Sequence, residues 1–377
     1  MDIKKEIRKL AKISETDYPL MSLYLNTKWE DEKQRGRVRL FVKNELKEAQ
    51  KLIKEEEKFR KSLQSDSEKI QRYIEGLLHR AYDERFKGIA IFACSGINAF
   101  IIYRSSIPFE NQFTISSKPS LRQMVQILDE NKSAIAVMVD TDRAKIFEMS
   151  LGEIYLESQI ESYVPGRHEQ GGWSQMRFQR HIREHMHQHH KGVAEQLIKL
   201  FDEERCENIV LIGQEHILAT FRALLPERVR EKIKGDLSAE FGEEPSSLAQ
   251  KVIEYLHREN LKEEDTIIEE LIETALARGA ATVGLRDTIE AINRSQVHRL
   301  VLDRDLKKKG WQCTKCLTLG EITTLSCPFC NSAIETIDLA EEMIRSVINR
   351  DGEVDMVRDH PKLSKYEGVG SMLRFKS

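Results

Sequence analysis

The pattern of hydrophobic and polar positions predicts a sheet covered by long charged helices in the first third of the chain. Residues 20–26 have the pattern of a strand, and further strands are predicted at residues 88–93 and 99–103. Residues 35–61 contain no proline, and their apolar residues recur at roughly helical spacing, which predicts a helix. A polar turn at residues 64–67 then leads into a second helix that ends near residue 85. This charged helical hairpin has two interpretations, a solvated layer on the sheet or an arm that contacts RNA.

The pattern in the middle of the chain predicts short apolar strands and long helices. The apolar run 133–139 predicts a strand, residues 140–142 a turn, and residues 144–149 the return strand. A glycine loop follows, and then a helix that continues to about residue 201. The next elements predicted are a buried strand at 208–213, a helix at 216–225 and acidic helices from residue 246 onward.

The last third again alternates helix and strand, which favours a small three-layer α/β/α domain. Helices are predicted at residues 267–277 and 284–293, a strand at 298–302, and a closing loop and strand at 366–375. The acidic residues 263–265 are interpreted as the joint before this unit. The predicted domains are residues 1–130, residues 131–265 with the glycine loop, and residues 266–377.

Composition narrows the class of protein. Hydrophobic residues make up 40% of the 377 residues and charged residues 32%, which is typical of a soluble protein with a highly charged surface. The formal net charge is only -3, so RNA binding would need a local basic patch. No apolar run approaches the length of a membrane-spanning helix, and residues 1–10 lack the core of a signal peptide. We therefore expect a cytoplasmic protein without a membrane partner.

Two CxxC pairs form the strongest chemical motif, with ten residues between the pairs. They consist of Cys313 and Cys316, then Cys327 and Cys330. Four thiolates supply the tetrahedral sulfur set that Zn²⁺ prefers, and they leave no open position for substrate, so a structural zinc is predicted in a mini-domain of about residues 311–332. The alternative, two disulfides, would require an oxidising compartment. The two other cysteines, Cys94 and Cys206, are interpreted as core residues.

The segment from Gly171 to Arg180, with the sequence GGWSQMRFQR, combines three useful properties. Gly171 and Gly172 allow a loop to enter tight spaces, and Gln175 offers a neutral amide that can hold a water molecule. The nearby arginines supply phosphate contacts. Trp173 has two open interpretations, stacking on a base or packing on its own domain. The segment indicates a loop that enters an RNA-lined cavity and helps water attack a bond.

Histidines cluster at the start of the helix that follows. Six of the eleven occur between residues 168 and 190, and His181, His185 and His189 share one helix face by their i, i+4, i+8 spacing. Three interpretations stay open: a metal-chelating pair, a solvated face, and a basic helix that faces a polynucleotide. The basic-helix interpretation is favoured by the neighbouring cations Arg167, Arg177, Arg180, Arg183 and Lys191. Partial protonation of these histidines near pH 7 would add to phosphate binding.

These residues resemble the class-1 peptide chain release factors of archaea and eukaryotes, together with Pelota and the Vms-like ribosome-rescue hydrolases. In the middle unit the resemblance consists of paired strands around Val139 and Ala144, the glycine loop, Arg177-Phe178 entering a basic helix, and the strand Ile209–Gly213. Residues 283–292, the closing segment 368–375 and the cysteine mini-domain resemble the family's last domain. The resemblance covers roughly two-thirds of the chain and is weak in the first third.

The sequence also departs from the family's pattern. Release factors carry Gly-Gly-Gln contiguously, whereas here Trp173 stands at the glutamine position and Gln175 follows two residues later. This GGxxQ form resembles a divergent bacterial and archaeal branch and the spaced glutamine of Vms-like enzymes. The stop-codon motif Asn-Ile-Lys-Ser is absent from the predicted hairpin tip at residues 64–67, and its Tyr-x-Cys partner is absent from residues 117–128.

The resemblance implies a fold and a function. The fold is three α/β domains, with a ribonuclease-H-like middle domain and a zinc-ribbon insertion in a C-terminal three-layer α/β/α domain. The function is hydrolysis of peptidyl-tRNA on the ribosome to rescue stalled complexes, with a translational GTPase as a further candidate partner. Three alternatives stay open: a stop-codon-dependent termination factor, a Pelota-like binding protein without hydrolysis, and a metal-dependent nuclease that uses the histidines. For hydrolysis, the implied catalytic residues are Gly171, Gly172 and Gln175, and the implied RNA-binding residues are Arg167, Trp173, Arg177, Arg180 and Arg183.

Overall fold

The chain folds into two compact units in the computed structural model, and each is described separately. One unit consists of Met1–Glu130 with Glu264–Ser377, and the other is Asn131–Glu263. The residues that the structure describes are 3–13, 16–29, 31–52, 57–79, 86–131, 133–150, 153–161, 173–204, 206–321 and 324–375. No helix in these described ranges is both long enough and apolar enough to cross a membrane.

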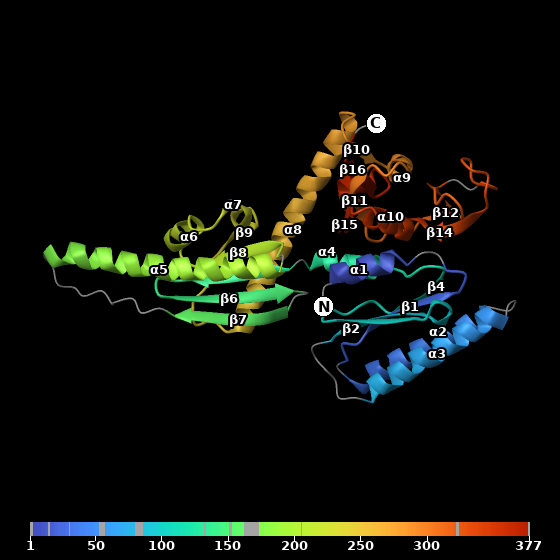
Figure 1. Cartoon of the computed structure of the whole chain (residues 1–377), viewed down its shortest axis with the longest axis horizontal. Coiled ribbons are helices and arrows are strands. Elements are labelled where there is room, and N and C mark those ends of the chain that lie inside the picture. Colours follow the sequence, from blue (N-terminus) through green and yellow to red (C-terminus); the bar gives the residue numbers. More distant parts are fainter. Residues whose placement is uncertain are drawn as a thin grey trace. The chain divides into compact units, whose positions relative to one another are not determined.

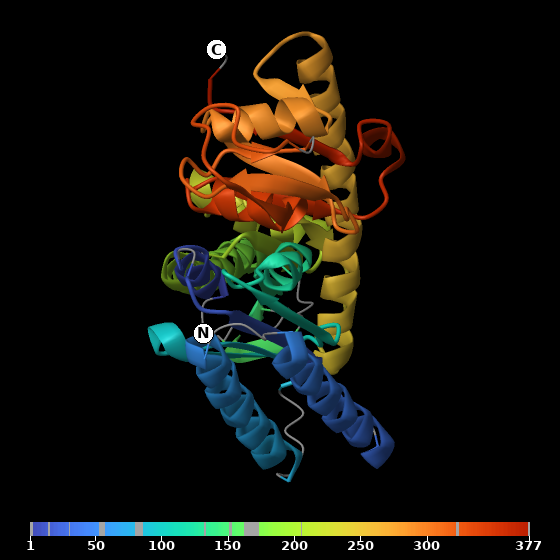
Figure 2. The same ribbon diagram turned by 90° about the vertical axis from the view of Figure 1, so that its right-hand side faces the viewer.

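The N-terminal domain of the first unit is an antiparallel sheet between two pairs of helices. Its strand order is β3-β2-β1-β4. Figures 1 and 2 show helices α2 and α3 together on one face, where alternate residues of β1 (Met21, Leu23 and Leu25) enter the core. Tyr24 points to the other face, against Phe92 and Phe109. The element bounds are α1 Ile3–Ala11, β1 Leu20–Asn26, α2 Glu32–Leu52, α3 Glu57–Leu78, β2 Gly88–Cys94, β3 Ala99–Ser105, β4 Gln112–Ser116 and α4 Arg122–Glu130.

The predicted turn at residues 64–67 is wrong, because these residues lie inside helix α3. Ser65 and Asp66 contact Ser95 in a short 3-10 turn, η1 (Ser95–Ile97), whereas Gln64 is exposed. Asp66 is fully buried and accepts hydrogen bonds from the backbone nitrogen and the hydroxyl of Ser95. The hydroxyl of Ser62 accepts one from the nitrogen of Gly96. Residues 64–67 are therefore not the hairpin tip, and the segment between α2 and α3 lies outside the described residues.

The middle unit is a five-stranded mixed sheet of order β7-β6-β5-β8-β9. Strands β5, β6 and β7 are antiparallel, whereas β8 and β9 run parallel to β5, which gives the predicted ribonuclease-H-like topology. Helices α5 and α6 cover one face, and the first part of α8 packs on the other face through Leu248, Val252 and Leu256. The bounds are β5 Ala134–Val139, β6 Arg143–Ser150, β7 Glu153–Glu161, α5 Trp173–Glu204, β8 Asn208–Ile212, α6 Glu215–Arg222, α7 Glu227–Arg230, β9 Ile233–Leu237 and α8 Pro245–Leu276.

The C-terminal domain belongs to the first unit and has the predicted α/β/α layers. Its sheet has the order β10-β16-β11-β15, and the last part of α8 packs on it through Ile268 and Leu271. A three-stranded sheet of order β13-β12-β14 carries the cysteines. The bounds are β10 Ala281–Val283, α9 Leu285–Asn293, β11 Val297–Asp303, β12 Lys309–Cys313, β13 Leu319–Gly320, β14 Ile334–Asp338, α10 Leu339–Ile348, β15 Glu353–Val357, α11 Pro361–Ser364 and β16 Val369–Leu373.

The division between the two compact units falls at Glu263 and Glu264, within the predicted joint, but no helix ends there. Helix α8 is continuous through these residues and contains the separately predicted helix at 267–277. The physical reason is visible in the sequence, because no glycine or proline follows Pro245 until Gly279. Acidic residues alone do not end a helix.

Candidate functional site

Helix α5 carries the residues that the sequence assigns to RNA. The sequence places Gln175 in a loop ahead of the helix, but α5 begins at Trp173, so Gln175 lies in its first turn and Arg177 in its second. Arg180 and Arg183 are exposed. The described structure does not include Arg167, Gly171 or Gly172, nor the side chains of Trp173, Gln175 and Arg177.

Among the described side chains of α5, those in the core of the middle domain lie in its second half. The buried apolar residues of this half include Val193, Ala194 and Leu197. Figure 1 shows the first half of the helix extending past the ends of strands β6 and β7. We call residues 173–188 the α5 arm. At 1.5 Å per residue, an arm of this length projects about 24 Å from His189.

Two buried histidines fasten the base of the α5 arm to the turn between β5 and β6. The Nε2 of His190 lies 3.0 Å from the carbonyl oxygen of Asp140, and its ring packs edge-on against Phe221. The backbone of Arg143 hydrogen-bonds to His189. Both side chains are almost completely buried. The contact is invisible in the sequence, since it joins residues 50 positions apart. The only available signal was a histidine pair directly before the apolar stripe that begins at Val193.

Burial lowers the pKa of His189 and of His190 below 6.5, and the hydrogen bonds to the backbone of Arg143 and Asp140 only partly oppose this. The geometry explains the direction for His190. Its Nε2–H donates to a carbonyl, whereas its buried Nδ1 has no partner among the described residues, so a second proton would have no acceptor. These two histidines therefore do not belong to a protonated phosphate-binding face, which corrects the prediction for His189.

The four predicted cysteines come together in the C-terminal domain. Their Sγ atoms all lie within 4.8 Å of one another, with Cys313–Cys330 at 3.4 Å and Cys316–Cys327 at 3.6 Å. A tetrahedron with metal–sulfur bonds of about 2.3 Å has edges of roughly 3.8 Å, so this set fits a metal ion. Among the described residues, no other cluster of histidine, cysteine or acidic side chains has this geometry.

Both CxxC pairs form the same tight turn. The nitrogens of Leu317 and Asn331 donate to the carbonyl oxygens of Cys313 and Cys327, and both residues have positive φ, 59° and 55°. Asparagine tolerates this conformation, whereas Leu317 adopts it at a steric cost. The turn directs the nitrogens of Lys315 and Cys316 at the sulfur of Cys313, 3.4 Å from each.

The thiols have unequal environments. Hydrogen bonding to Ser332 is the main cause that lowers the pKa of Cys330 to about 6, while burial raises the pKa of Cys327 to about 11. Outside the cluster, Cys94 and Cys206 are buried, as the sequence predicts, and burial raises the pKa of Cys206 to about 11. Its thiol donates to the carbonyl oxygen of Asn208, which makes Cys206 an inert core residue.

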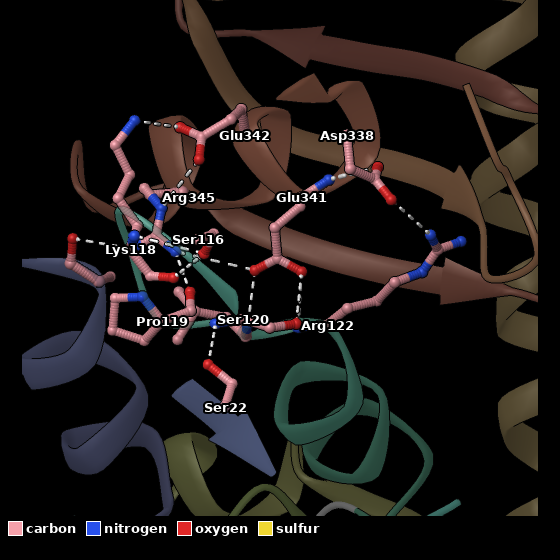
Figure 3. Close-up of polar contacts among 12 residues, drawn as sticks. Ser22, Ser116, Lys118, Pro119, Ser120, Arg122, Asp338, Glu341, Glu342 and Arg345 are labelled. Carbon is pink, nitrogen blue, oxygen red and sulfur yellow. Dashed lines mark hydrogen bonds and ion pairs between the residues drawn. The ribbon is translucent and has the colours of Figure 1, made fainter. Parts of the chain in front are cut away.

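A buried polar network, which the sequence does not predict, joins residues 116–122 to helix α10 (Figure 3). The carboxylate of Glu341 accepts hydrogen bonds from the nitrogens of Leu121 and Arg122 at the start of α4. Burial raises the pKa of Glu341, and nearby Arg345 opposes this shift.

The same network reaches the cysteine sheet through Lys118. Its ammonium group lies 3.1 Å from the carboxylate of Glu342 and also hydrogen-bonds to the amide of Gln312, the residue before Cys313. Arg345 extends the network by donating to the carbonyl oxygen of Pro119. Each of these contacts joins residues about 200 positions apart, which is why the sequence pattern gives no sign of them.

Fold and site together define a mixed α/β protein with three features. Its ribonuclease-H-like domain carries a projecting basic helix, its C-terminal sheet carries four clustered cysteines, and a buried polar network joins its N- and C-terminal domains. Residues 119–260 match the sequence model of Bacterial archaeo-eukaryotic release factor family 10.

Two relatives of known function are also release factors. Peptide chain release factor subunit 1 of Methanobrevibacter smithii is 21% identical over 283 residues, covering 68% of this chain and 68% of that protein. The protein of the same name from Thermococcus sibiricus is 22% identical over an alignment of 418 positions, gaps included, which covers 100% of this chain and 97% of that protein. These sequence matches support a release-factor superfamily member, which is a translation-related class of proteins, and they confirm the resemblance.

The chain is also similar to two solved structures. Dom34 of S. cerevisiae, described as a translation termination-like factor, has a TM-score of 0.43 and 11% identity, with 74% of this chain and 75% of that chain covered. Archaeoglobus fulgidus Pelota has a TM-score of 0.32 and 14% identity, with 77% and 79% covered.

Proposed function

We propose that the protein hydrolyses the ester bond of peptidyl-tRNA on the ribosome and thereby rescues stalled complexes. The observation that carries this proposal is the α5 arm, which bears Gln175 near its end and belongs to the region that matches the release-factor family. Arg180 and Arg183 on the arm are exposed and free to contact phosphates. The proposed setting is the cytoplasm.

The proposed chemistry needs no titratable side chain. A water molecule must be placed at the ester carbonyl, and the developing oxyanion needs hydrogen-bond donors. Gln175 lies in the first turn of α5, where backbone N–H groups have no partner within the helix. In this proposal the amide of Gln175 orients the water, while its N–H and the positive end of the helix stabilise the oxyanion. Gly171 and Gly172 admit the preceding segment between tRNA and ribosomal RNA.

We propose further that Zn²⁺ is the metal held by Cys313, Cys316, Cys327 and Cys330. The support is the donor set of four thiols and sulfur separations that fit a tetrahedral ion. Bound there, zinc would hold together a small sheet whose apolar packing includes Trp311. Because four protein ligands complete its coordination, the ion has no part in the hydrolysis.

The test is peptide release from purified ribosome–peptidyl-tRNA complexes with an empty or non-stop decoding site. Wild type is expected to free the peptide, and Gln175→Ala to lose at least tenfold in rate. The matched control is Gln188→Ala, because Gln188 is an exposed glutamine on the same helix, bonded only to Glu184 in the described structure. Equal release by Gln175→Ala and wild type would refute the catalytic role of Gln175.

The same assay separates the alternatives. Ribosome binding without release by wild type would favour a Pelota-like binding protein, and release only with a stop codon would favour a termination factor. Chelator-sensitive RNA cleavage would favour a nuclease, although among the described residues no histidine cluster is positioned for a metal. Adding a translational GTPase to the assay tests that proposed partner.

A further inference from the structure

A cleft of about 740 Å³ lies within the first unit, between the N-terminal domain and the cysteine sheet. One wall is strand β4 and the opposite wall is strand β14, each of which contributes most of its length to the lining. The buried polar network of Lys118, Glu341, Glu342 and Arg345 forms part of the lining (Figure 3). Its size falls in the range of pockets that bind ligands.

Both walls are edge strands within the part of the chain that the structure describes. Strand β4 ends the order β3-β2-β1-β4, and β14 ends the order β13-β12-β14. An edge strand offers a row of unpaired N–H and C=O groups, which is a template for one more strand. Most proteins cover or blunt such edges, so two that line one cleft suggest a binding function.

The registers show which backbone groups of β14 point outward. Two backbone hydrogen bonds flank the paired strands: the nitrogen of Thr314 donates to the carbonyl oxygen of Ala333, and the nitrogen of Leu339 donates to the carbonyl oxygen of Lys308. In this register the backbone N–H and C=O groups of the odd-numbered residues of β14 point toward β12. Because the direction alternates along an antiparallel strand, the N–H and C=O groups of Ile334 and Thr336 face the open edge. No hydrogen bond to these groups is found among the described residues.

The same reasoning applies to β4. The backbone nitrogen of Thr27 donates to the carbonyl oxygen of Lys87, the residue before β2, so the backbone groups of odd-numbered residues point toward β2. The backbone nitrogen of Asn26 donates to the side-chain oxygen of Asn111, the residue before β4. The backbone groups of even-numbered residues of β1 therefore point toward β4. The register pairs Ser22 with Thr114, which leaves the backbone groups of Phe113 and Ile115 at the open edge. The hydroxyl of Thr114 lines the cleft, is buried and has no hydrogen-bond partner in the described structure.

The charges of the lining identify the class of occupant. Five cationic and six carboxylate side chains line the cleft, and the buried cations are already paired, as in Lys118 with Glu342. A nucleic-acid backbone needs an excess of unpaired cations, which this cleft lacks. A polypeptide of low net charge needs only backbone partners and mixed polar contacts, and both are present.

We propose that this cleft binds an extended segment of a partner protein, which adds as a fourth strand to the open edge of β14 with β4 as the opposite wall. The five residues of β14 span about 17 Å, so a segment of five to seven residues fits. The proposal is independent of Gln175 and of the hydrolysis proposed above.

The first probe is a library of random seven-residue peptides displayed on phage and selected against the full chain. Enriched peptides are synthesised with a fluorescent label, and their affinity is measured by anisotropy. Thr336→Pro removes an outward N–H at an exposed position, whereas Thr336→Ala keeps it and serves as the matched control. We expect at least tenfold weaker binding to Thr336→Pro, about 1.4 kcal/mol, and near wild-type binding to Thr336→Ala.

The second probe leaves the protein unchanged and so does not depend on the folding of a variant. The best peptide is N-methylated at one residue at a time. Strand addition predicts that methylation abolishes binding at every second residue and is tolerated at the residues between, because only alternate N–H groups face β14. Tolerance at all positions, equal binding to Thr336→Pro, or no enrichment on the wild-type chain would overturn the proposal. So would preferential binding of a single-stranded RNA oligonucleotide in competition with the peptide.

Discussion

Replacing His190 with alanine tests whether the histidine pair holds the base of the α5 arm. The side chain is fully buried, hydrogen-bonded to the carbonyl of Asp140 at 3.0 Å and packed on Phe221 with ring centroids 6.1 Å apart. Loss of a hydrogen bond costs about 1 kcal/mol, and loss of the aromatic pair costs about 1 kcal/mol more. The cavity left by the ring adds a similar amount. The expected destabilisation is about 3 kcal/mol.

Differential scanning calorimetry is the suitable assay, because a chain with two compact units is expected to unfold in more than one transition. The transition of the middle unit should shift down by about 10 °C in His190→Ala. The control is His187→Ala, which removes an exposed histidine three residues earlier on the same helix. Equal shifts in the two variants, or no shift in either, would refute the role assigned to His190.

The pH dependence provides a second readout with a definite sign. Burial lowers the pKa of His189 and His190 in the folded state, so below about pH 6.5 the unfolded chain binds more protons than the folded one. The contribution that the two neutral histidines make to the stability of the middle unit is therefore fully present above about pH 6.5, and it is lost as the pH falls toward the folded-state pKa values. His190→Ala should reduce this slope below about pH 6.5. An unchanged slope would show that His190 does not titrate as the geometry requires.

Three further changes follow from the same structure. Lys118→Met removes one of the two cations that contact the buried carboxylate of Glu342, leaving Arg345 in place, and should lower stability by about 2 kcal/mol in thermal unfolding. The exposed Lys307→Met in the same cleft should have little effect. Metal removal by a chelator should change the fluorescence of Trp311, which packs against Cys327; unchanged fluorescence in a chain shown to contain metal would contradict a structural role. Glu184→Pro should break α5 within its exposed arm and reduce peptide release at least tenfold, with the unfolding temperature of the middle unit almost unchanged. Release equal to that of Glu184→Ala would show that a continuous arm is unnecessary.

The local sequence pattern predicts those strands that are apolar along their whole length. Strands such as β2 and β5 were recognised because all their residues are buried between layers. The cysteine cluster was recognised because its spacing encodes the turn geometry directly. The strands predicted from the sequence do not include β4 or β7. Strand β4 (QFTIS) alternates polar and apolar residues, whereas β7 (EIYLESQIE) has three apolar residues and then three polar residues in a row, so its pattern does not identify a half-buried strand.

Other features depend on contacts that no local pattern contains. Asp66 in a polar run looks like a turn residue until its partner, Ser95, is known. His189 looks like one third of an exposed histidine face until the β5–β6 turn is placed beside it. The polar network around Lys118 joins residues from opposite ends of the chain. Asp66, His189 and Lys118 are polar residues at buried positions, and sequence alone does not show their distant partners.

The position of Gln175 depends on helix α5, which contains it. Gln175 lies about 21 Å along the helix axis from His189, where α5 enters the domain core. A small rotation at the base would therefore move the glutamine by several ångströms, and hydrolysis without an acid or base tolerates little misplacement. The buried histidines and the apolar residues from Val193 onward fix that base. The same helix would thus position Gln175 and supply local basic charge, although the whole chain has a net charge of -3.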